Sequence, residues 1–216
     1  MIAAVCMLGA CASHQARSMY TTGFLKDYSQ LKKGGKGEAL LVYINPQTDF
    51  TAYTRILMDP IRIYASKEDS MMNVSSEAQR TILNYADAKV RDTLAADYVF
   101  VQEPGPGVMH LRIALTEAEG SKVVLDTVST IVPIGLALSG LQRLTTGSSS
   151  FVGSAGIEAE MRDSLTGTRL WAAVDSRIGD KVTGKFDKFD KWHAVKEAFD
   201  FWAKLLQMRL AEEREK

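Results

Sequence analysis

Strict alternation of apolar and polar residues in two stretches constrains the fold of this chain more than any other sequence feature. Residues 108–116 place four apolar side chains on one face of a strand: Met109, Leu111, Ile113 and Leu115. The opposite face carries His110, Arg112 and Thr116. Residues 156–162 repeat the pattern, with Ile157, Ala159 and Met161 opposite Glu158, Glu160 and Arg162. Such alternation is typical of antiparallel strands that bury one face and leave the other to solvent.

A turn at residues 163–167 joins the second stretch to a third apolar series, Leu170, Ala172 and Val174, which predicts a β-hairpin. Glu158 and Glu160 share one face of this hairpin, about 7 Å apart by strand rise, a separation that some glycosidases use. Because Arg162 continues the same face, we interpret these residues as a solvated ladder of charges and not as a catalytic pair. Asp163 and Asp175 are expected to cap turns.

Two segments have the apolar spacing of amphipathic helices. The first, residues 76–94, opens with Ser76 and Gln79, a capping-box pattern. The second, from residue 188 onward, repeats large apolar side chains every three or four positions: Trp192, Val195, Phe199, Trp202, Leu206 and Leu210. We expect this second helix to cover one face of the sheet.

Shorter apolar runs at residues 40–44, 55–65 and 98–101 predict further strands. The middle run changes phase at Asp59 and Pro60, and a proline cannot donate to a strand ladder, so we expect a sheet edge or a bulge there. Strands joined by tight turns, with helices before and after them, predict an α+β fold. We expect a mainly antiparallel sheet of about four to six strands, covered by two main helices, with a long apolar insertion between two strands.

Both cysteines, Cys6 and Cys11, precede residue 12, so the body of the chain cannot hold a disulfide, a catalytic thiol or a cysteine-ligated metal. Residues 2–10 are apolar, too short to span a bilayer as a helix, and typical of the central part of an export signal. The end of this run, Leu8, Gly9 and Ala10 before Cys11, resembles the lipobox of bacterial lipoproteins. In that family the signal is cut before the cysteine, whose sulfur receives a diacylglyceryl group and whose amine is acylated.

Cys11 is therefore the expected lipidation site, and its acyl chains, palmitate among them, would hold the protein on a membrane. Export signals open with positively charged residues, and none stands between Met1 and the apolar run. Either the signal is abnormal, or it is truncated and its start lies further upstream. The other interpretation makes residues 2–10 a buried helix start or strand, with Cys11 in the core. Ala12, and not an aspartate, follows Cys11. In enterobacterial lipoproteins, which this segment resembles, that implies sorting to the outer membrane, on its periplasmic face, with the inner membrane as the alternative.

These features divide the chain into a signal segment at 1–10, a lipidated tether at 11–37 and a single α+β domain at 38–216. The middle of the tether carries Phe24, Leu25, Tyr28 and Leu31, which we expect to dock on the domain. The 26 basic and 26 acidic residues cancel, which leaves no global field to attract nucleic acid.

Residues 120–153 form a connection long enough to be functional or structured in its own right. Its centre, residues 128–144, is apolar, and three interpretations stay open. They are a short helix that packs on the domain, a segment in the membrane interface beside the lipid anchor, and a surface for a partner or for oligomerisation. The residues expected to make a membrane or partner contact are Ile131, Val132, Ile134, Leu136, Leu138 and Leu141.

The search for chemistry gives no catalytic constellation. His14, His110 and His193 are the only histidines, and no two have the spacing of a metal-binding pair, so we expect surface residues. The serines at 148–150 lack the pattern of a nucleophile elbow. We therefore expect no catalytic residue, no cofactor and no metal site.

Several short motifs resemble a family of bacterial lipoproteins catalogued only as a domain of unknown function, DUF3313. They are residues 23–29, 43–46, 58–60, 125–127, 146–147 and 151–160, with Asp163, Thr166, Gly167, Asp175, Arg177 and Gly179. The resemblance implies export, lipidation and a single domain, and it brings no activity, cofactor or catalytic residue.

Our first hypothesis is a non-enzymatic envelope lipoprotein whose sheet or apolar segment contacts an envelope protein partner. The second is a periplasmic small-molecule or lipid binder, with residues 120–153 as a lid over the sheet. An apolar pocket beneath that segment would favour the binder, whereas an exposed apolar ridge would favour the interaction protein.

Overall fold

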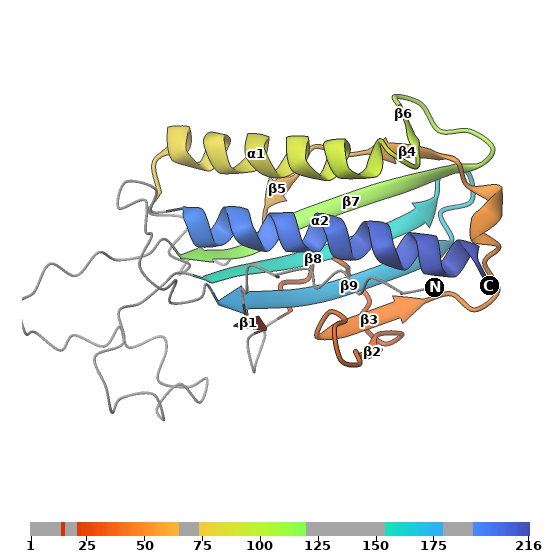
Figure 1. Cartoon of the computed structure of the whole chain (residues 1–216), viewed down its shortest axis with the longest axis horizontal. Coiled ribbons are helices and arrows are strands. Elements are labelled where there is room, and N and C mark those ends of the chain that lie inside the picture. The colour runs from red at the N-terminus through yellow and green to blue at the C-terminus, as the bar shows by residue number, and fades with distance from the viewer. Residues whose placement is uncertain (1–13, 16–20, 65–73, 120–153, 179–191) are drawn as a thin grey trace, which may run out of the picture.

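The structure, a computed structural model, describes residues 14–15, 21–64, 74–119, 154–178 and 192–216. Two helices lie side by side on one face of a single sheet (Figure 1). The predicted α+β class is confirmed.

Three long antiparallel strands form the centre of the sheet: β7 (Val108–Glu119), β8 (Ser154–Asp163) and β9 (Arg169–Ile178). β8 and β9 form the predicted hairpin. Beyond β9 the sheet continues with β3 (Leu41–Ile44) and then β2 (Lys32–Lys33). β1 (His14–Gln15) pairs with the end of β9, on the same side as β3.

On the other side of β7 the strand pairs are parallel, which corrects both the predicted strand count and the predicted antiparallel character. β4 (Arg55–Met58) runs parallel to β7 and to β6 (Val99–Val101), and β5 (Arg62–Ile63) runs parallel to β7. The described residues form one mixed sheet of nine strands. The strand count was too low because a two-residue strand is too short to show alternation. The parallel pairs were missed because a helix, α1, lies between β4 and β6 in the chain, and short apolar runs do not show which strands such a crossover pairs.

Asp59 and Pro60 end β4, which lies between β6 and β7. The expected sheet edge or bulge at this position is confirmed: Met58 pairs with Leu111 and Arg62 with Ala114, so one extra residue stands between β4 and β5. Among the described strands, β5 pairs with β7 alone. A short 3-10 helix, η1 (Phe50–Ala52), precedes β4, and the Asp49 side chain caps it.

Both predicted helices are present, as α1 (Ser76–Leu94) and α2 (His193–Arg214). The cap of α1 is Ser75 and not the expected Ser76, since the Ser75 hydroxyl accepts from the backbone N–H of Ala78 at 3.3 Å. The six predicted apolar residues of the second helix are all buried. Among the helices of the described residues, none is long and apolar enough to cross a bilayer.

Both faces of the sheet are buried, and each has its own apolar cluster. The helix face, covered by α1 and α2, carries the predicted apolar series of β7 and the apolar side chains of α2. The opposite face carries a smaller cluster: Phe24, Leu25, Ala114, Ala172 and Val174. The polar side of the alternating pattern therefore faces protein over much of its area, and His110, Arg112 and Arg162 keep side chains that are 28%, 30% and 33% exposed.

Candidate functional site

A segment that we call the strap, residues 21–31, covers the face of the sheet opposite the helices. Phe24 and Leu25 lie in its middle and are 9% and 1% exposed. They pack with Ala114, Ala172 and Val174 of β7 and β9. We call this side of the sheet the strap face.

Glu158 of β8 holds the strap to the sheet. Its carboxylate accepts from the backbone N–H and the hydroxyl of Thr22 at 2.6 and 2.9 Å, and from the Tyr28 hydroxyl at 2.6 Å. The backbone N–H of Leu25 adds a longer bond at 3.4 Å. Burial and the Glu158 hydrogen bond raise the pKa of Tyr28 to about 12. Buried polar groups need such partners, and here the strap supplies them.

Glu160, two residues further along β8, is paired with three arginines. Its oxygens lie 2.6 Å from Nη1 of Arg112, 3.0 Å from Nη2 of Arg162 and 3.1 Å from Nη2 of Arg169. Arg169 also donates to the carbonyl of Leu25 at 3.0 Å and to that of Asp27 at 2.8 Å. A buried charge is tolerated when it is paired and hydrogen-bonded in this way.

The solvated charge ladder expected from the sequence was wrong. Glu158 is 0% exposed and Glu160 is 1% exposed, because the strap covers the strand face on which they lie. Of the three residues of the predicted ladder, Arg162 alone keeps contact with solvent, with a side chain 33% exposed. The two glutamates bind the strap and the arginines. That they are not a catalytic pair stays a prediction.

A third buried carboxylate, Asp175 of β9, lies on the helix face. It accepts from the indole N–H of Trp202 at 2.8 Å, from Nε of Arg177 at 3.3 Å and from the backbone N–H of Leu40 at 3.2 Å. Burial lowers the pKa of Arg177, and the Asp175 carboxylate opposes that shift. Asp175 therefore joins α2 and the chain before β3 to β9, and the expected turn cap was wrong there. At Asp163 the cap is confirmed, since its carboxylate accepts from the backbone N–H groups of residues 165 and 166.

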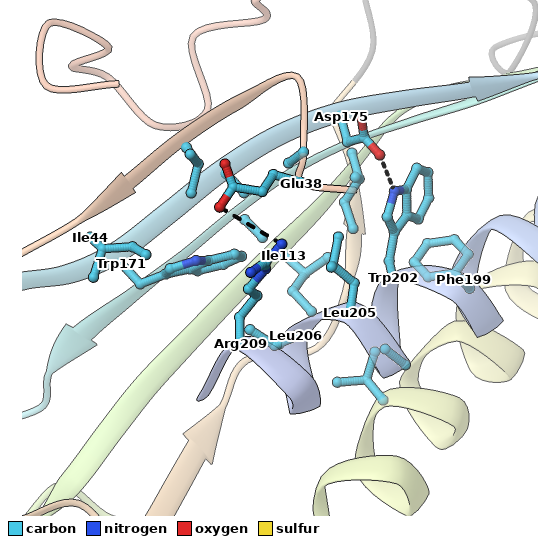
Figure 2. Close-up of a pocket in the computed structure, with 17 residues that line it drawn as sticks. Glu38, Ile44, Ile113, Trp171, Asp175, Phe199, Trp202, Leu205, Leu206 and Arg209 are labelled. Atoms are coloured by element: carbon cyan, nitrogen blue, oxygen red, sulfur yellow. Dashed lines mark hydrogen bonds and ion pairs between the residues drawn. The ribbon is translucent and has the colours of Figure 1, made fainter. Parts of the chain in front are cut away.

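A small apolar cavity lies between α2 and the strands β3 and β9 (Figure 2). Its volume is about 50 Å³, and Trp171, Trp202, Leu206 and Ile113 are among its lining residues. Glu38 and Arg209 lie opposite each other beside it, with 3.8 Å between Oε1 and Nη2. The indole N–H of Trp171 is buried and has no hydrogen-bond partner within the described ranges.

A second hollow of about 660 Å³ lies between residues 44–51 and the end of α2, at Glu213 and Lys216. It is lined by more polar groups than the first cavity, among them Asn45, Gln47 and Asp49. No group of three or more His, Cys, Asp and Glu side chains in the described parts of the chain is arranged to hold a metal ion.

The sequence model of a family described as a protein of unknown function, DUF3313, matches residues 20–206. The match begins at the strap and ends within α2, so it includes both faces of the sheet. The chain belongs to the DUF3313 family.

A curated relative of this DUF3313 chain is the uncharacterized lipoprotein YdcL of Escherichia coli strain K12, 29% identical over 170 residues. The alignment covers 76% of this chain and 75% of YdcL, and the same protein of strain O157:H7 matches equally. Among solved structures, the PelC dodecamer from Paraburkholderia phytofirmans is 14% identical, with a TM-score of 0.39 over 77% of this chain and 94% of PelC. A neuraminyllactose-binding hemagglutinin homologue from Helicobacter pylori is 12% identical, with a TM-score of 0.37 over 78% and 86% of the two chains.

Several predicted sites of the DUF3313 chain lie outside the described residues. They are the lipidation site Cys11, the candidate contact residues Ile131, Val132, Ile134, Leu136, Leu138 and Leu141, and the proposed lid at 120–153. Of the histidines, His110 lies 2.8 Å from an Asp59 oxygen and His193 lies 3.2 Å from a Glu197 oxygen, each with a partly exposed side chain.

Sequence reasoning missed the strap as a site of buried charge. The signal was present in β9, where residues 170–174 are apolar without interruption. A strand that is apolar at every position is buried on both faces, and its neighbour β8 must then be buried on both faces as well.

Proposed function

We propose that this DUF3313 chain is a lipid-anchored lipoprotein of the bacterial envelope that faces the periplasm and serves as a non-enzymatic interaction or structural module. The lipobox-like residues before Cys11 and the lipoprotein relative YdcL support the anchor. The outer membrane is the proposed location and the inner membrane the alternative.

The observation that carries the structural role is the engagement of every buried carboxylate described above. Glu158 holds the strap, Glu160 pairs with three arginines, and Asp175 binds Trp202 and Arg177. Buried polar groups need hydrogen-bond partners, and the donors around these three carboxylates supply them. Glu158 therefore fastens the strap to the sheet directly, and Glu160 does so through Arg169, which donates to the carbonyls of Leu25 and Asp27. Asp175 joins α2 and Leu40 to β9.

Radiolabelled palmitate tests the anchor directly. The gene is expressed with its upstream codons, as wild type, Cys11→Ala and the matched control Cys6→Ala, and the membranes are separated on a density gradient. We expect label in the wild type and in Cys6→Ala, in the outer-membrane fraction, and none in Cys11→Ala. Label in the inner membrane would select the alternative location. Soluble, unlabelled wild-type protein would refute the proposal.

The cavity at Trp171 keeps a second function under consideration, that of a small-molecule or lipid binder. A cavity of about 150 Å³ holds a benzene molecule, and this cavity has about 50 Å³. Binding would therefore require α2 to move and the pair Glu38–Arg209 to part. Titration with fatty acids, followed by the fluorescence of the tryptophans, tests this function, and an unchanged signal up to saturating lipid would refute it.

A further inference from the structure

β1 brings the chain that follows Cys11 to one particular end of the sheet. His14 pairs with Ile178 and Gln15 with Arg177, at the last residues of β9. Three peptide units join Cys11 to His14, so their Cα atoms are at most about 11 Å apart. A lipid on Cys11 would therefore hold the end of β9 near the bilayer surface.

The apolar connection begins and ends at this same end of the sheet. Glu119 closes β7 and Ser154 opens β8, and the two residues pair with each other. Ser154 also pairs with Ile178, the residue that binds β1. Residues 120–153 thus leave and rejoin the sheet one or two strand spacings, about 5–10 Å, from the point where β1 attaches. We call this the anchor end.

The opposite end of the sheet, which we call the turn end, has a different surface. The β8–β9 turn lies there, as do the connection between β6 and β7 and the end of α2 (Figure 1). Leu165 is 61% exposed in that turn. Exposed acidic side chains lie on the neighbouring loops and termini: Asp49, Asp97, Glu103 and Glu215. Anionic lipid headgroups repel such a surface.

We propose that the sheet stands with its anchor end against an anionic lipid bilayer and its turn end pointing away from it. The orientation rests on the proposed lipidation of Cys11. β9 has ten residues, so nine steps of about 3.3 Å separate its ends, and the two ends of an upright sheet differ in height by about 30 Å. The hollow between residues 44–51 and the end of α2 then faces the periplasm, where a partner can reach it.

Fluorescent labels at the two ends test this orientation, because a lipidated Cys11 has no free thiol and the body has no cysteine. His193→Cys places a label at the start of α2, where the side chain is 51% exposed, and Leu165→Cys places one at the turn end. A second pair, Tyr64→Cys and Val99→Cys, uses residues that are 46% and 64% exposed. The full-length lipidated variants are reconstituted in vesicles of phosphatidylethanolamine and phosphatidylglycerol containing headgroup-spin-labelled lipid.

We expect the spin-labelled lipid to quench the label at 193 strongly and the label at 165 hardly at all, with the same order for 64 and 99. Equal quenching within each pair would show a sheet that lies flat and would overturn the orientation, as would stronger quenching at the turn end. Palmitate incorporation is measured on the same preparations. Protein that incorporates palmitate but shows the wrong quenching order refutes the orientation alone. Wild-type protein that incorporates no palmitate refutes the anchor and the orientation together.

Discussion

The helix face and the strap face of the sheet are both buried, but by different means. Two long helices cover the helix face, and large side chains such as Phe199, Trp202 and Leu206 fill the space beneath them. One short segment covers the strap face, where the apolar residues of the strands are small and two glutamates lie among them.

The difference shows that the apolar area a covering segment buries determines which interactions must stabilise it. Burial of apolar surface contributes in proportion to area, so two helices gain much from packing alone. The strap buries little apolar area, and directed hydrogen bonds to Glu158 and Arg169 make up for it. The helix face should therefore be sensitive to lost volume, and the strap face to the loss of single polar groups.

The largest expected effect is a cavity on the helix face. Phe199→Ala removes a ring that is 0% exposed and should lower the free energy of unfolding by about 3–5 kcal/mol. Urea unfolding followed by tryptophan fluorescence measures it. Met208→Ala, on the same helix and 50% exposed, should change stability by less than about 0.5 kcal/mol. Equal effects of the two substitutions would contradict the assignment of the core.

Loss of the Glu158 carboxylate should release the strap and leave the helix face folded. Glu158→Ala removes the acceptor of four hydrogen bonds and should cost about 2–3 kcal/mol. Limited digestion with trypsin should cut sooner after Lys26, which is exposed in the strap, while the circular dichroism spectrum stays unchanged. Glu103→Ala, at an exposed position, serves as the control. Equal cleavage rates in both variants would show that Glu158 does not hold the strap.

A polar contact on the helix face should matter less. Trp202→Phe removes the N–H that Asp175 accepts at 2.8 Å and should cost about 1–2 kcal/mol beyond the loss of ring size. Trp171→Phe supplies the correction for ring size, because the Trp171 N–H has no partner in the described structure. Equal losses of unfolding free energy in the two variants would mean that the hydrogen bond from Trp202 to Asp175 adds nothing to stability.

The smallest effect is confined to alkaline pH. Burial and Glu158 raise the pKa of Tyr28 to about 12, whereas an unfolded chain releases this proton near pH 10. Between these values the folded state binds more protons, so stability falls as pH rises. Tyr28→Phe should reduce that slope in urea midpoints measured from pH 9 to pH 11.5.

Tyr53 provides an internal comparison for the alkaline slope. Its pKa is also raised to about 12, by burial and by Asp163. The double variant Tyr28→Phe, Tyr53→Phe should therefore flatten the slope further than either single variant. A slope that stays at the wild-type value in the double variant would rule out both tyrosines as its source.

The sequence predicted the elements well where a single periodicity runs over many residues. α1, α2 and the strands β7 to β9 are of this kind, and each overlaps the predicted range, although β7 runs on to Glu119 and α2 begins at His193 and ends at Arg214. It failed where a partner distant in the chain decides burial, as with Glu158 and Glu160, since alternation does not say what covers the polar face. The strap residues Phe24 and Leu25 were recognised as apolar, but their position against the two glutamates depends on contacts between residues 130 or more positions apart in the chain.

These long separations also determine when the molecule can become complete. The strap is held by β8, and β3 is held by β9, so both early segments wait for strands near residues 154–178. During synthesis, which starts at the N-terminus, Phe24, Leu25 and Leu41 stay exposed to solvent until β8 and β9 have been made. Closing such long loops slows folding. The strap and β3 are therefore among the last segments to be buried, although they come early in the chain. A chaperone that binds the unfolded chain would be needed most at these two segments.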